Sequence, residues 1–473
     1  MKLSEPKKHS KILFINAAIS GPGWNSMHPH GGNEGSYMFH GIAYVSAFLK
    51  SRGHTCSLLD LRKLSSWKHF EEAARQADYD YAFVSFLSLD AFTGACAIRS
   101  LKEVWPTRPV LVGGVHVSVC KDKVFPPDNF DDYYLKRAVP KRMDEYLAYK
   151  GEPAFDAAKF PKADCVVLGE GEIASAELVE SDGPLPSYVE GGIIEDLGDL
   201  PHCDRDLFDN NCEITSPLLP HLPQPFITIT FGRGCPYKCT FCATAHQQSS
   251  SKPRTKNVAS FMDELEKLKI RYGKLGSLMI HDDVLFNAKW IEEWNIEIRN
   301  RFGYTPYWCQ MRADFICKHP DLLETMAKCG MVWCSLGIES GSQRTLDFIK
   351  KQTTVEQNIK ACEILGNLGI NNFCNWMLGF PTETPEDVKA TGDLIKQVKP
   401  NWHSANMYCN YPGTQLDKYI RENDLLLPSW HLMTHYPWQR TIKGVDYGLA
   451  LRTRDQVCAA VPNHIVQPRY WSV

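Results

Sequence analysis

The chain has 473 residues, of which 44% are hydrophobic and 23% charged, values of a globular protein long enough for two or three domains. The formal net charge of −3 gives no reason to expect nucleic acid or an anionic membrane as a partner, and no apolar run reaches the roughly 18 residues that a membrane span needs. The polar, lysine-bearing N-terminus lacks the apolar core of a signal peptide, so we expect a cytoplasmic protein.

The cysteines do not look like a disulfide framework. There are 17 of them, an odd number in a long chain, and several lie inside apolar runs, as Cys165, Cys334 and Cys374 do. Cysteines in such places are small buried hydrophobes of a reducing compartment.

The first part of the chain alternates short apolar runs with helical patterns. Between the first two runs, apolar residues recur at helical spacing from Ile42 to Leu49, and Gly53 follows as a stop signal. This alternation predicts a parallel sheet with helices on both faces, that is, a Rossmann-like doubly wound α/β domain over residues 1–172. The runs are 12–15, 56–61, 81–86, 110–112 and 165–168.

Ligands of such a sheet bind beyond the carboxyl ends of its strands. Taken singly, each candidate residue at those ends is a weak signal, because a Gly-Gly pair is usually a turn and a lone histidine is more often structural than a ligand. Taken together they mark an edge where a ligand could bind. The residues are Asp60, Ser85, Ser88, Gly113, Gly114, His116, Gly169, Glu170 and Glu172.

Two segments carry no strand pattern. Residues 120–164 are polar and proline-bearing, and we interpret them as an excursion from the first domain. Residues 173–225 hold many prolines and few apolar runs, which predicts a linker between domains.

From Phe226 onward the β/α pattern restarts. Apolar residues at helical spacing between Phe261 and Leu268, closed by Gly273, predict one clear helix. There is room for a helix between each pair of runs, so periodicity predicts repeated β/α units over residues 226–425. The runs are 226–231, 278–280, 307–311, 332–338, 373–380 and 405–411.

Three cysteines follow the first of these runs at C-x3-C-x2-C spacing: Cys235, Cys239 and Cys242. Their thiolates could hold three irons of a cubic 4Fe–4S cluster, which takes four cysteines when it is fully ligated. The fourth iron would stay open for a ligand that is not protein. Two glycines of the loop let the backbone bend tightly around such a core.

A zinc loop is the alternative interpretation. Structural zinc takes four ligands in paired C-x2-4-C groups, and here only His246 lies close enough to complete such a set locally. A non-enzymatic protein that binds zinc or an iron–sulfur cluster therefore stays open.

Charged residues stand where strands of the second part end, the place where β/α enzymes keep their chemistry. They are Asp282 with Asp283, Arg312, and Glu339. A carboxylate buried in an apolar strand needs a partner or a ligand. Pairing of Arg312 with one of the acids is the alternative to a ligand contact.

The cysteine motif, with the aromatic Phe241 before its last cysteine, resembles the signature of the radical S-adenosylmethionine (SAM) superfamily. The resemblance implies that the open iron chelates SAM and that one electron from the cluster, supplied by a reductant such as flavodoxin or ferredoxin, releases a 5′-deoxyadenosyl radical. It also implies an open partial (β/α)6 barrel over residues 226–425. The SAM contacts that it implies are Phe241, Asp282, Asp283, Arg312 and Glu339.

The runs Val110–His116 and Val166–Glu172 resemble the cobalamin-binding domain that precedes many radical SAM enzymes. The histidine motif D-x-H-x-x-G of other cobalamin proteins is missing, since Asp60 is followed by Leu61 and Arg62. Many radical SAM relatives bind cobalamin without that histidine. The resemblance implies cobalamin contacts at Ser85, Ser88, Gly113, Gly114, His116, Gly169 and Glu170.

Together the resemblances predict a cobalamin-dependent radical SAM methyltransferase that acts on an unactivated centre of a small molecule or natural product. A radical reaction without methyl transfer, such as oxidative cyclisation, rearrangement or carbon–carbon bond formation, is the alternative, because the motifs do not separate the two. Residues 426–473 are expected to form a small α-rich extension. Its aromatic and histidine residues are Trp430, His431, His435, Trp438 and Trp471, more often core than cofactor contacts.

Overall fold

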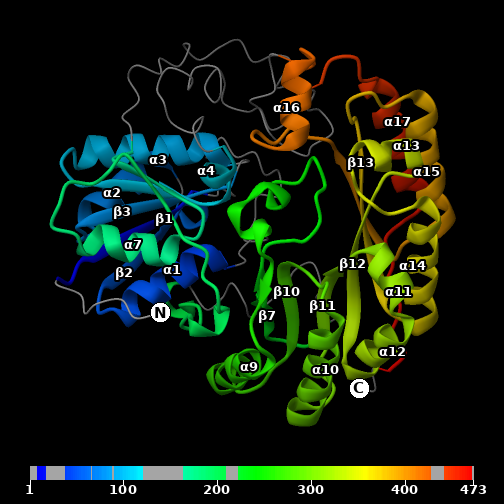
Figure 1. Cartoon of the computed structure of the whole chain (residues 1–473), viewed down its shortest axis with the longest axis horizontal. Coiled ribbons are helices and arrows are strands. Elements are labelled where there is room, and N and C mark those ends of the chain that lie inside the picture. The colour runs from blue at the N-terminus through cyan, green and yellow to red at the C-terminus, as the bar shows by residue number, and fades with distance from the viewer. Residues whose placement is uncertain are drawn as a thin grey trace.

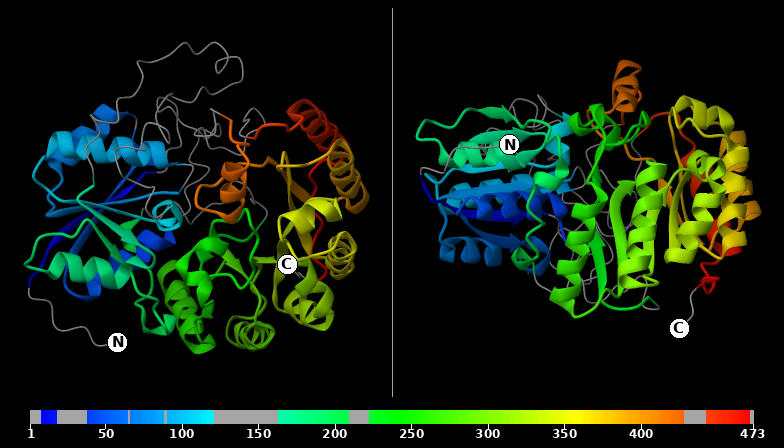
Figure 2. Two further views of the ribbon diagram at one scale, coloured as in Figure 1. Left: turned by 45° about the horizontal axis from the view of Figure 1, so that its top comes forward. Right: turned by 60° about the horizontal axis from the view of Figure 1, so that its bottom comes forward.

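A computed structural model describes residues 8–17, 38–64, 66–87, 90–120, 163–208, 222–427 and 442–470. Two parallel sheets lie side by side, one in each half of the chain, with helices packed around them (Figures 1 and 2). The two expected α/β units are therefore confirmed. Most of the excursion expected at 120–164 lies outside the described residues, as do Trp430, His431, His435, Trp438 and Trp471.

The first sheet has six strands: β1 (Lys11–Asn16), β2 (Thr55–Asp60), β3 (Tyr81–Ser85), β4 (Val110–Gly113), β5 (Cys165–Leu168) and β6 (Tyr188–Glu190). Their order is β2-β1-β3-β4-β5-β6, and all neighbours are parallel. The first five strands coincide with the apolar runs. In this order the strand sequence reverses between β1 and β3. That position is the topological switch point, where such sheets bind ligands.

Four helices cover this sheet: α1 (His40–Ser51), α2 (Trp67–Gln76), α3 (Ala91–Val104) and α7 (Gly171–Glu180). Alternate residues of each strand point to opposite faces. Phe14 and Phe83 pack with α1 and α7, whereas Leu13 and Val84 pack with α2 and α3. The helices lie on both sides of the strands in Figure 1, so the doubly wound architecture is confirmed.

The segment expected to be a linker, 173–225, contributes to the first domain. Most of α7 falls in it, and β6 extends the first sheet by pairing parallel with β5. β6 has only three residues, of which Tyr188 and Glu190 are exposed, so no apolar run announced it.

The second sheet has six strands: β7 (Phe226–Ile229), β10 (Ser277–Val284), β11 (Tyr307–Met311), β12 (Met331–Glu339), β13 (Asn371–Leu378) and β14 (Trp402–Met407). They follow one another in sequence order across the sheet and are all parallel. β7 and β14 are the two edges and do not pair with each other in the described chain. The open six-stranded barrel is confirmed.

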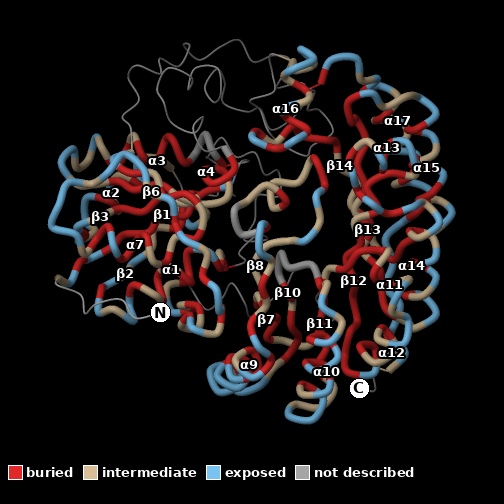
Figure 3. The backbone as a smooth tube through the Cα atoms, in the orientation of Figure 1, coloured by how far each residue is buried: buried red, intermediate tan, exposed pale blue. Residues whose placement is uncertain are grey.

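The helices of the second half are α9 (Val258–Tyr272), α10 (Ala288–Phe302), α11 (Ala313–Lys318), α12 (Pro320–Cys329), α13 (Gln343–Phe348), α14 (Val355–Leu368), α15 (Pro385–Val398), α16 (Gln415–Glu422) and α17 (Tyr447–Ala460). The strands are buried, and the outer faces of α9 and α10 are exposed (Figure 3). α9 begins after Asn257, whose side chain accepts from the Ser260 N–H, and ends at Gly273, as the sequence predicted. α17 packs against α15, which confirms a helical C-terminal extension.

Among the described residues, no helix combines the length and the apolar character that crossing a membrane requires.

Candidate functional site

The two ends of the cysteine loop lie next to each other where the loop joins the barrel. Two short antiparallel strands, β8 (Gly232–Arg233) and β9 (Arg254–Thr255), pair at its base and enclose residues 234–253. All three predicted cysteines lie in this loop as free thiols, with Cys239 buried and the other two half-buried. Gly234, at φ 82°, makes the turn that its lack of a side chain permits.

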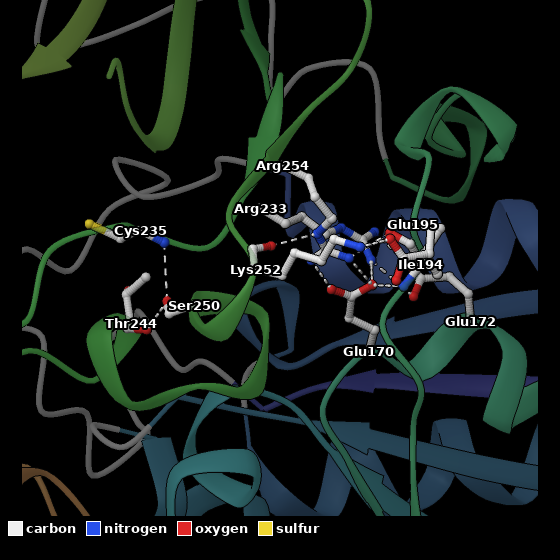
Figure 4. Close-up of polar contacts among 10 residues, drawn as sticks. All are labelled: Glu170, Glu172, Ile194, Glu195, Arg233, Cys235, Thr244, Ser250, Lys252 and Arg254. Carbon is white, nitrogen blue, oxygen red and sulfur yellow. Dashed lines mark hydrogen bonds and ion pairs between the residues drawn. The ribbon is translucent and has the colours of Figure 1, made fainter. Parts of the chain in front are cut away.

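Backbone contacts fix the loop on both sides. The Cys235 N–H donates to Ser250 Oγ, 3.1 Å away, which in turn donates to the Thr244 carbonyl (Figure 4). The Thr240 N–H donates to the carbonyl of Ile349 in the barrel at 2.9 Å. The loop is thus tied to itself and to the barrel before any cofactor is considered.

His246 is not available as a fourth zinc ligand. Its Nδ1 lies 2.8 Å from the Cys242 carbonyl and its Nε2 accepts the Gln415 N–H at 3.0 Å, so both ring nitrogens are in use. Across the described ranges, no group of three or more His, Cys, Asp or Glu side chains is arranged around one metal ion. An iron–sulfur cluster does not need its cysteines to converge on one ion, because each cysteine binds a different iron.

Arg312 lies against the cysteine loop. Its Nη1 is 3.9 Å from Cys239 Sγ, and its guanidinium stacks 3.7 Å from the centre of the Tyr237 ring. Its Nε donates to Asp314 at 3.0 Å and its Nη2 to the Lys351 carbonyl at 2.6 Å. The internal pairing left open by the sequence is therefore present, and a SAM contact by Arg312 stays a prediction.

Glu339 also has an internal partner. It is the last residue of β12, at φ 62°, and accepts from Lys351 Nζ at 2.7 Å, with both side chains 9% exposed. Gly337 makes space for this ion pair, because a Cβ at that position would collide with both side chains. Burial would lower the pKa of Lys351, but the charges of Glu339 and Cys239 and the hydrogen bond to Glu339 together raise it, so Lys351 carries its proton.

The donor set fits a three-cysteine cluster with SAM at its open iron. Burial raises the pKa of the Cys239 thiol, and the nearby cations Lys351 and Arg312 offset part of that rise. Cations beside a thiolate stabilise the negative charge that a cluster places there. Contacts of these side chains with the amino acid end of SAM stay a prediction.

The other predicted SAM contacts are placed less fully. Phe241 is partly buried, and its ring centre lies 6.0 Å from that of Phe380 in an apolar cluster. Asp282 and Asp283 belong to β10, but their side chains are outside the described part. Their contacts stay predictions.

The predicted cobalamin residues gather at the carboxyl edge of the first sheet. Ser85 ends β3, Gly113 ends β4 and Gly114 follows it, and Gly169 follows β5, where its N–H donates to Ser118 Oγ at 2.9 Å. A Cβ on Gly114, at φ 104°, would lie 2.8 Å from the Phe86 carbonyl oxygen. Gly114 thus lacks a side chain because Ser85 and Phe86 pack against it, and the cobalamin contacts at this edge stay a prediction. Ser88 lies outside the described residues.

His116, two residues after Gly114, is fully buried. It has no exposed surface and packs with a ring-centre distance of 5.7 Å against Phe86. Burial lowers its pKa to about 3, so the ring is neutral at physiological pH. His116 is the second residue of α4 (Val115–Cys120), and its contact with cobalamin stays a prediction.

Glu170 is likewise committed elsewhere. It forms an ion pair with Arg254 at the base of the cysteine loop, and its neighbour Glu172 pairs with Arg233 (Figure 4). Neither arginine was among the residues predicted from the sequence. The available signal was the position of Arg233 directly before the Gly-Cys-Pro of the motif, but nothing in the sequence named its partner.

Comparison with known proteins agrees with the arrangement. Residues 229–395 match the model of the Radical SAM superfamily and residues 37–137 that of the B12 binding domain. An uncharacterised methyltransferase of Pyrococcus horikoshii is 29% identical over 327 residues, 64% of this chain and 70% of that protein. The anaerobic magnesium-protoporphyrin IX monomethyl ester cyclase of Rubrivivax gelatinosus is 24% identical over 412 residues, 86% of this chain and 69% of the cyclase.

Among solved structures, the radical S-adenosylmethionine methyltransferase TsrM of Kitasatospora setae superimposes with a TM-score of 0.59. The match is 16% identical and covers 87% of this chain and 76% of TsrM. At this identity the likeness speaks for the fold, and it extends across both sheets.

Proposed function

The chain belongs to the radical SAM superfamily and carries a B12-binding domain, and from this we propose that it is a cobalamin-dependent methyltransferase acting on an unactivated centre of a small molecule. Its cofactors are a 4Fe–4S cluster, SAM and cobalamin. A centre that is too weak a nucleophile to attack SAM directly must first be converted to a radical, which is what this cofactor set provides.

One observation carries the proposal: the cysteine loop is attached to the corrin-binding sheet. Arg233 and Arg254, at the base of the loop, bind Glu170 and Glu172 at the carboxyl end of β5. This attachment supports placing the two proposed cofactor regions beside each other, as they must be if one substrate is to meet both.

When bound, the cluster would cleave SAM reductively and cobalamin would carry the methyl group. The residues of the chain bind and orient these groups. Cys235, Cys239 and Cys242 would hold three irons. Lys351 and Arg312 keep positive charge beside Cys239, and the glycine edge of the first sheet would receive the corrin.

The proposal sets the stoichiometry. One SAM gives its methyl group and leaves as S-adenosylhomocysteine. A second SAM would take one electron and end as methionine and 5′-deoxyadenosine, with a hydrogen atom taken from the substrate. With a further electron for the cobalamin, each methylation would consume two SAM and two electrons. We expect flavodoxin or ferredoxin in the cytoplasm to supply them.

The test is turnover with SAM labelled in its methyl group. We expect one label in the product, with S-adenosylhomocysteine and 5′-deoxyadenosine released in equal amounts. The Cys239→Ala variant should lose iron and release neither product. The Cys458→Ala variant, which changes a half-buried residue of α17, should behave as the parent protein. A turned-over product without label contradicts methyl transfer.

Oxidative cyclisation is the second candidate, and the breadth of the match to the Rubrivivax cyclase, 86% of this chain, favours keeping it. It would consume SAM to 5′-deoxyadenosine without S-adenosylhomocysteine. The same measurement therefore separates the two reactions.

A further inference from the structure

We propose that Glu170 and Glu172 are positioning residues: they clamp the base of the cysteine loop to the B12-binding domain and so fix the distance between cluster and corrin. The inference rests on the proposed cofactors, and it gives Glu170 a different role from the cobalamin contact that the sequence predicted.

The first half of the clamp is centred on Glu170. Arg254 approaches its carboxylate with both terminal nitrogens, Nη1 lying 3.3 Å from Oε2, and also donates from Nη1 to the Ile194 carbonyl at 2.5 Å. The Ile194 N–H donates to the same Glu170 Oε2 at 2.9 Å, and Arg254 Nε donates to the Lys252 carbonyl at 3.0 Å. The carboxylate thus joins β5, the segment around residue 194 and β9.

The second half is centred on Glu172, in the first turn of α7. Arg233 binds it with both terminal nitrogens, Nη1 lying 3.2 Å from Oε2, and Nη1 also lies 3.3 Å from Glu170 Oε2. The guanidinium is 5.4 Å from the ring centre of Tyr44 on α1. Figure 4 shows both arginines pointing from the loop base towards the two carboxylates.

All four side chains of the clamp are shielded from water. Their exposures are 7% for Glu170, 3% for Glu172, 19% for Arg233 and 6% for Arg254. Removing one partner of a buried ion pair is strongly destabilising, because the other charge is left buried and uncompensated. Loss of one carboxylate should therefore loosen the clamp far more than loss of an exposed ion pair would.

A further buried contact follows directly after β9. Lys256 Nζ donates to Glu264 at 2.5 Å and to Tyr44 Oη at 2.7 Å. Tyr44 belongs to the first domain and Glu264 to the barrel helix α9, so this lysine joins the same two bodies.

The loop depends on the clamp because its own base is weak. β8 and β9 have two residues each, and even a longer isolated hairpin is marginally stable in water. Arg233 stands two positions before Cys235, so any shift of β8 moves the first cysteine. Glu170, at the corrin edge, thus sets where that cysteine stands.

The test compares the holoenzyme with Glu170→Gln and Glu172→Gln, which remove charge at nearly constant volume. Two quantities are measured anaerobically: the rate of iron release to a chelator and the affinity for cobalamin. We expect iron release to accelerate about tenfold or more. Iron leaves when the loop opens locally, and a broken buried ion pair makes that opening more frequent. Cobalamin affinity should stay within about twofold of the parent, since both carboxylates are engaged by the arginines of the loop base.

A spectroscopic readout separates positioning from general stability. The reduced cluster and cob(II)alamin are both paramagnetic, and their magnetic coupling depends steeply on their separation. In protein that still carries both cofactors, we expect Glu170→Gln to change this coupling in the electron paramagnetic resonance spectrum.

The matched control is Glu195→Gln. Glu195 adjoins Ile194 and pairs with Lys252 of the cysteine loop, but the two side chains are 68% and 57% exposed. Loss of this pair should leave iron release and magnetic coupling unchanged.

Two results overturn the proposal: unchanged iron release in both variants, or weakened cobalamin binding alone. If a carboxylate variant loses both cofactors, Arg254→Lys decides, because it keeps the charge, loses the fork geometry and leaves the corrin edge untouched. Faster iron release with normal cobalamin affinity in that variant supports the clamp, and parental iron release refutes it. None of these readouts depends on turnover, so failure of the clamp is distinct from failure of the methyltransferase assignment.

Discussion

Arg312 shows how a single residue prepares the cluster site from the barrel side. It contacts Cys239, Tyr237 and Asp314 together with the Lys351 carbonyl, and is 5% exposed. Groups that support ligands in this way tune a metal centre, because net charge and hydrogen bonds to sulfur set the reduction potential of an iron–sulfur cluster.

Arg312→Gln should therefore make the cluster harder to reduce. Losing a positive charge and an N–H···S contact destabilises the reduced, more negative state, so the midpoint potential should become more negative. Cluster affinity or activity should fall about 10- to 100-fold, as it does when outer-sphere partners of metal ligands are removed. A redox titration followed by electron paramagnetic resonance measures the potential.

Arg301→Gln is the control for this change. Arg301 is exposed and pairs with Glu266 and Glu297 on the outer helices, away from the loop. If the two variants share the parental potential, Arg312 does not act on the cluster.

At the scale of elements, the turn between β13 and α15 holds an unusual carboxyl group. Glu383 Oε2 accepts the Gly379 N–H at 2.6 Å, while its buried Oε1 has no hydrogen-bond partner among the described residues. Burial raises the pKa of Glu383 to about 8, although the N–H groups of Gly379 and Phe380 oppose the rise. The folded turn therefore favours the protonated acid.

This pKa makes stability depend on pH in a defined direction. The unfolded pKa is near 4.5 and the folded one near 8, so between these values unfolding releases a proton and the free energy of unfolding falls as pH rises. The slope approaches about 1.4 kcal/mol per pH unit for one proton. Thermal unfolding from pH 5.5 to 7.5 should show a falling midpoint in the parent and a flatter profile in Glu383→Gln.

Glu386→Gln, at an exposed position in the first turn of α15, is the comparison. It should keep the parental profile. A Glu383→Gln profile as steep as the parental one would assign the dependence to another group.

The elements that could be predicted are those whose burial requires an apolar run or a helical periodicity of apolar residues in the sequence. Every central strand is an apolar run, and α9 carries both its periodicity and its Gly273 stop. β6, β8 and β9 were not predictable, because they are two or three residues long and polar or half-exposed. At the site, the C-x3-C-x2-C spacing predicted the three cluster cysteines. The ion pairs of Glu170 and Glu339 could not be predicted, because folding alone brings their partners together.

At the scale of the whole molecule, the two halves also touch away from the clamp and from Lys256. The chain after β14 packs on the first domain: Cys409 belongs to the same buried cluster as Leu13 and Val117. Gly413, at φ 80°, lies so close to α4 that a Cβ would run into the Val119 carbonyl oxygen. These contacts together hold the sheets in one fixed relation.

Gly413→Ala should weaken this relation. A left-handed alanine costs about 1–2 kcal/mol, and forcing a methyl group against packed backbone adds about 1–3 kcal/mol. We expect a lower unfolding temperature and faster proteolysis between the halves.

Gly444→Ala separates the two contributions, because Gly444 has the same φ of 80° and a Cβ added there would have no neighbour within 4 Å. It should show the backbone cost alone. Equal effects of the two alanines would mean that the contact with Val119 carries no weight.

The paired base of the cysteine loop has an engineering consequence. Opposed residues of an antiparallel pair stand about 4.5–5.5 Å apart, so a foreign loop whose ends meet that separation can be spliced between Arg233 and Arg254 without displacing β7 or α9. A transplanted loop with a fourth cysteine would cap the vacant iron and turn a radical initiator into a simple electron relay on an unaltered scaffold.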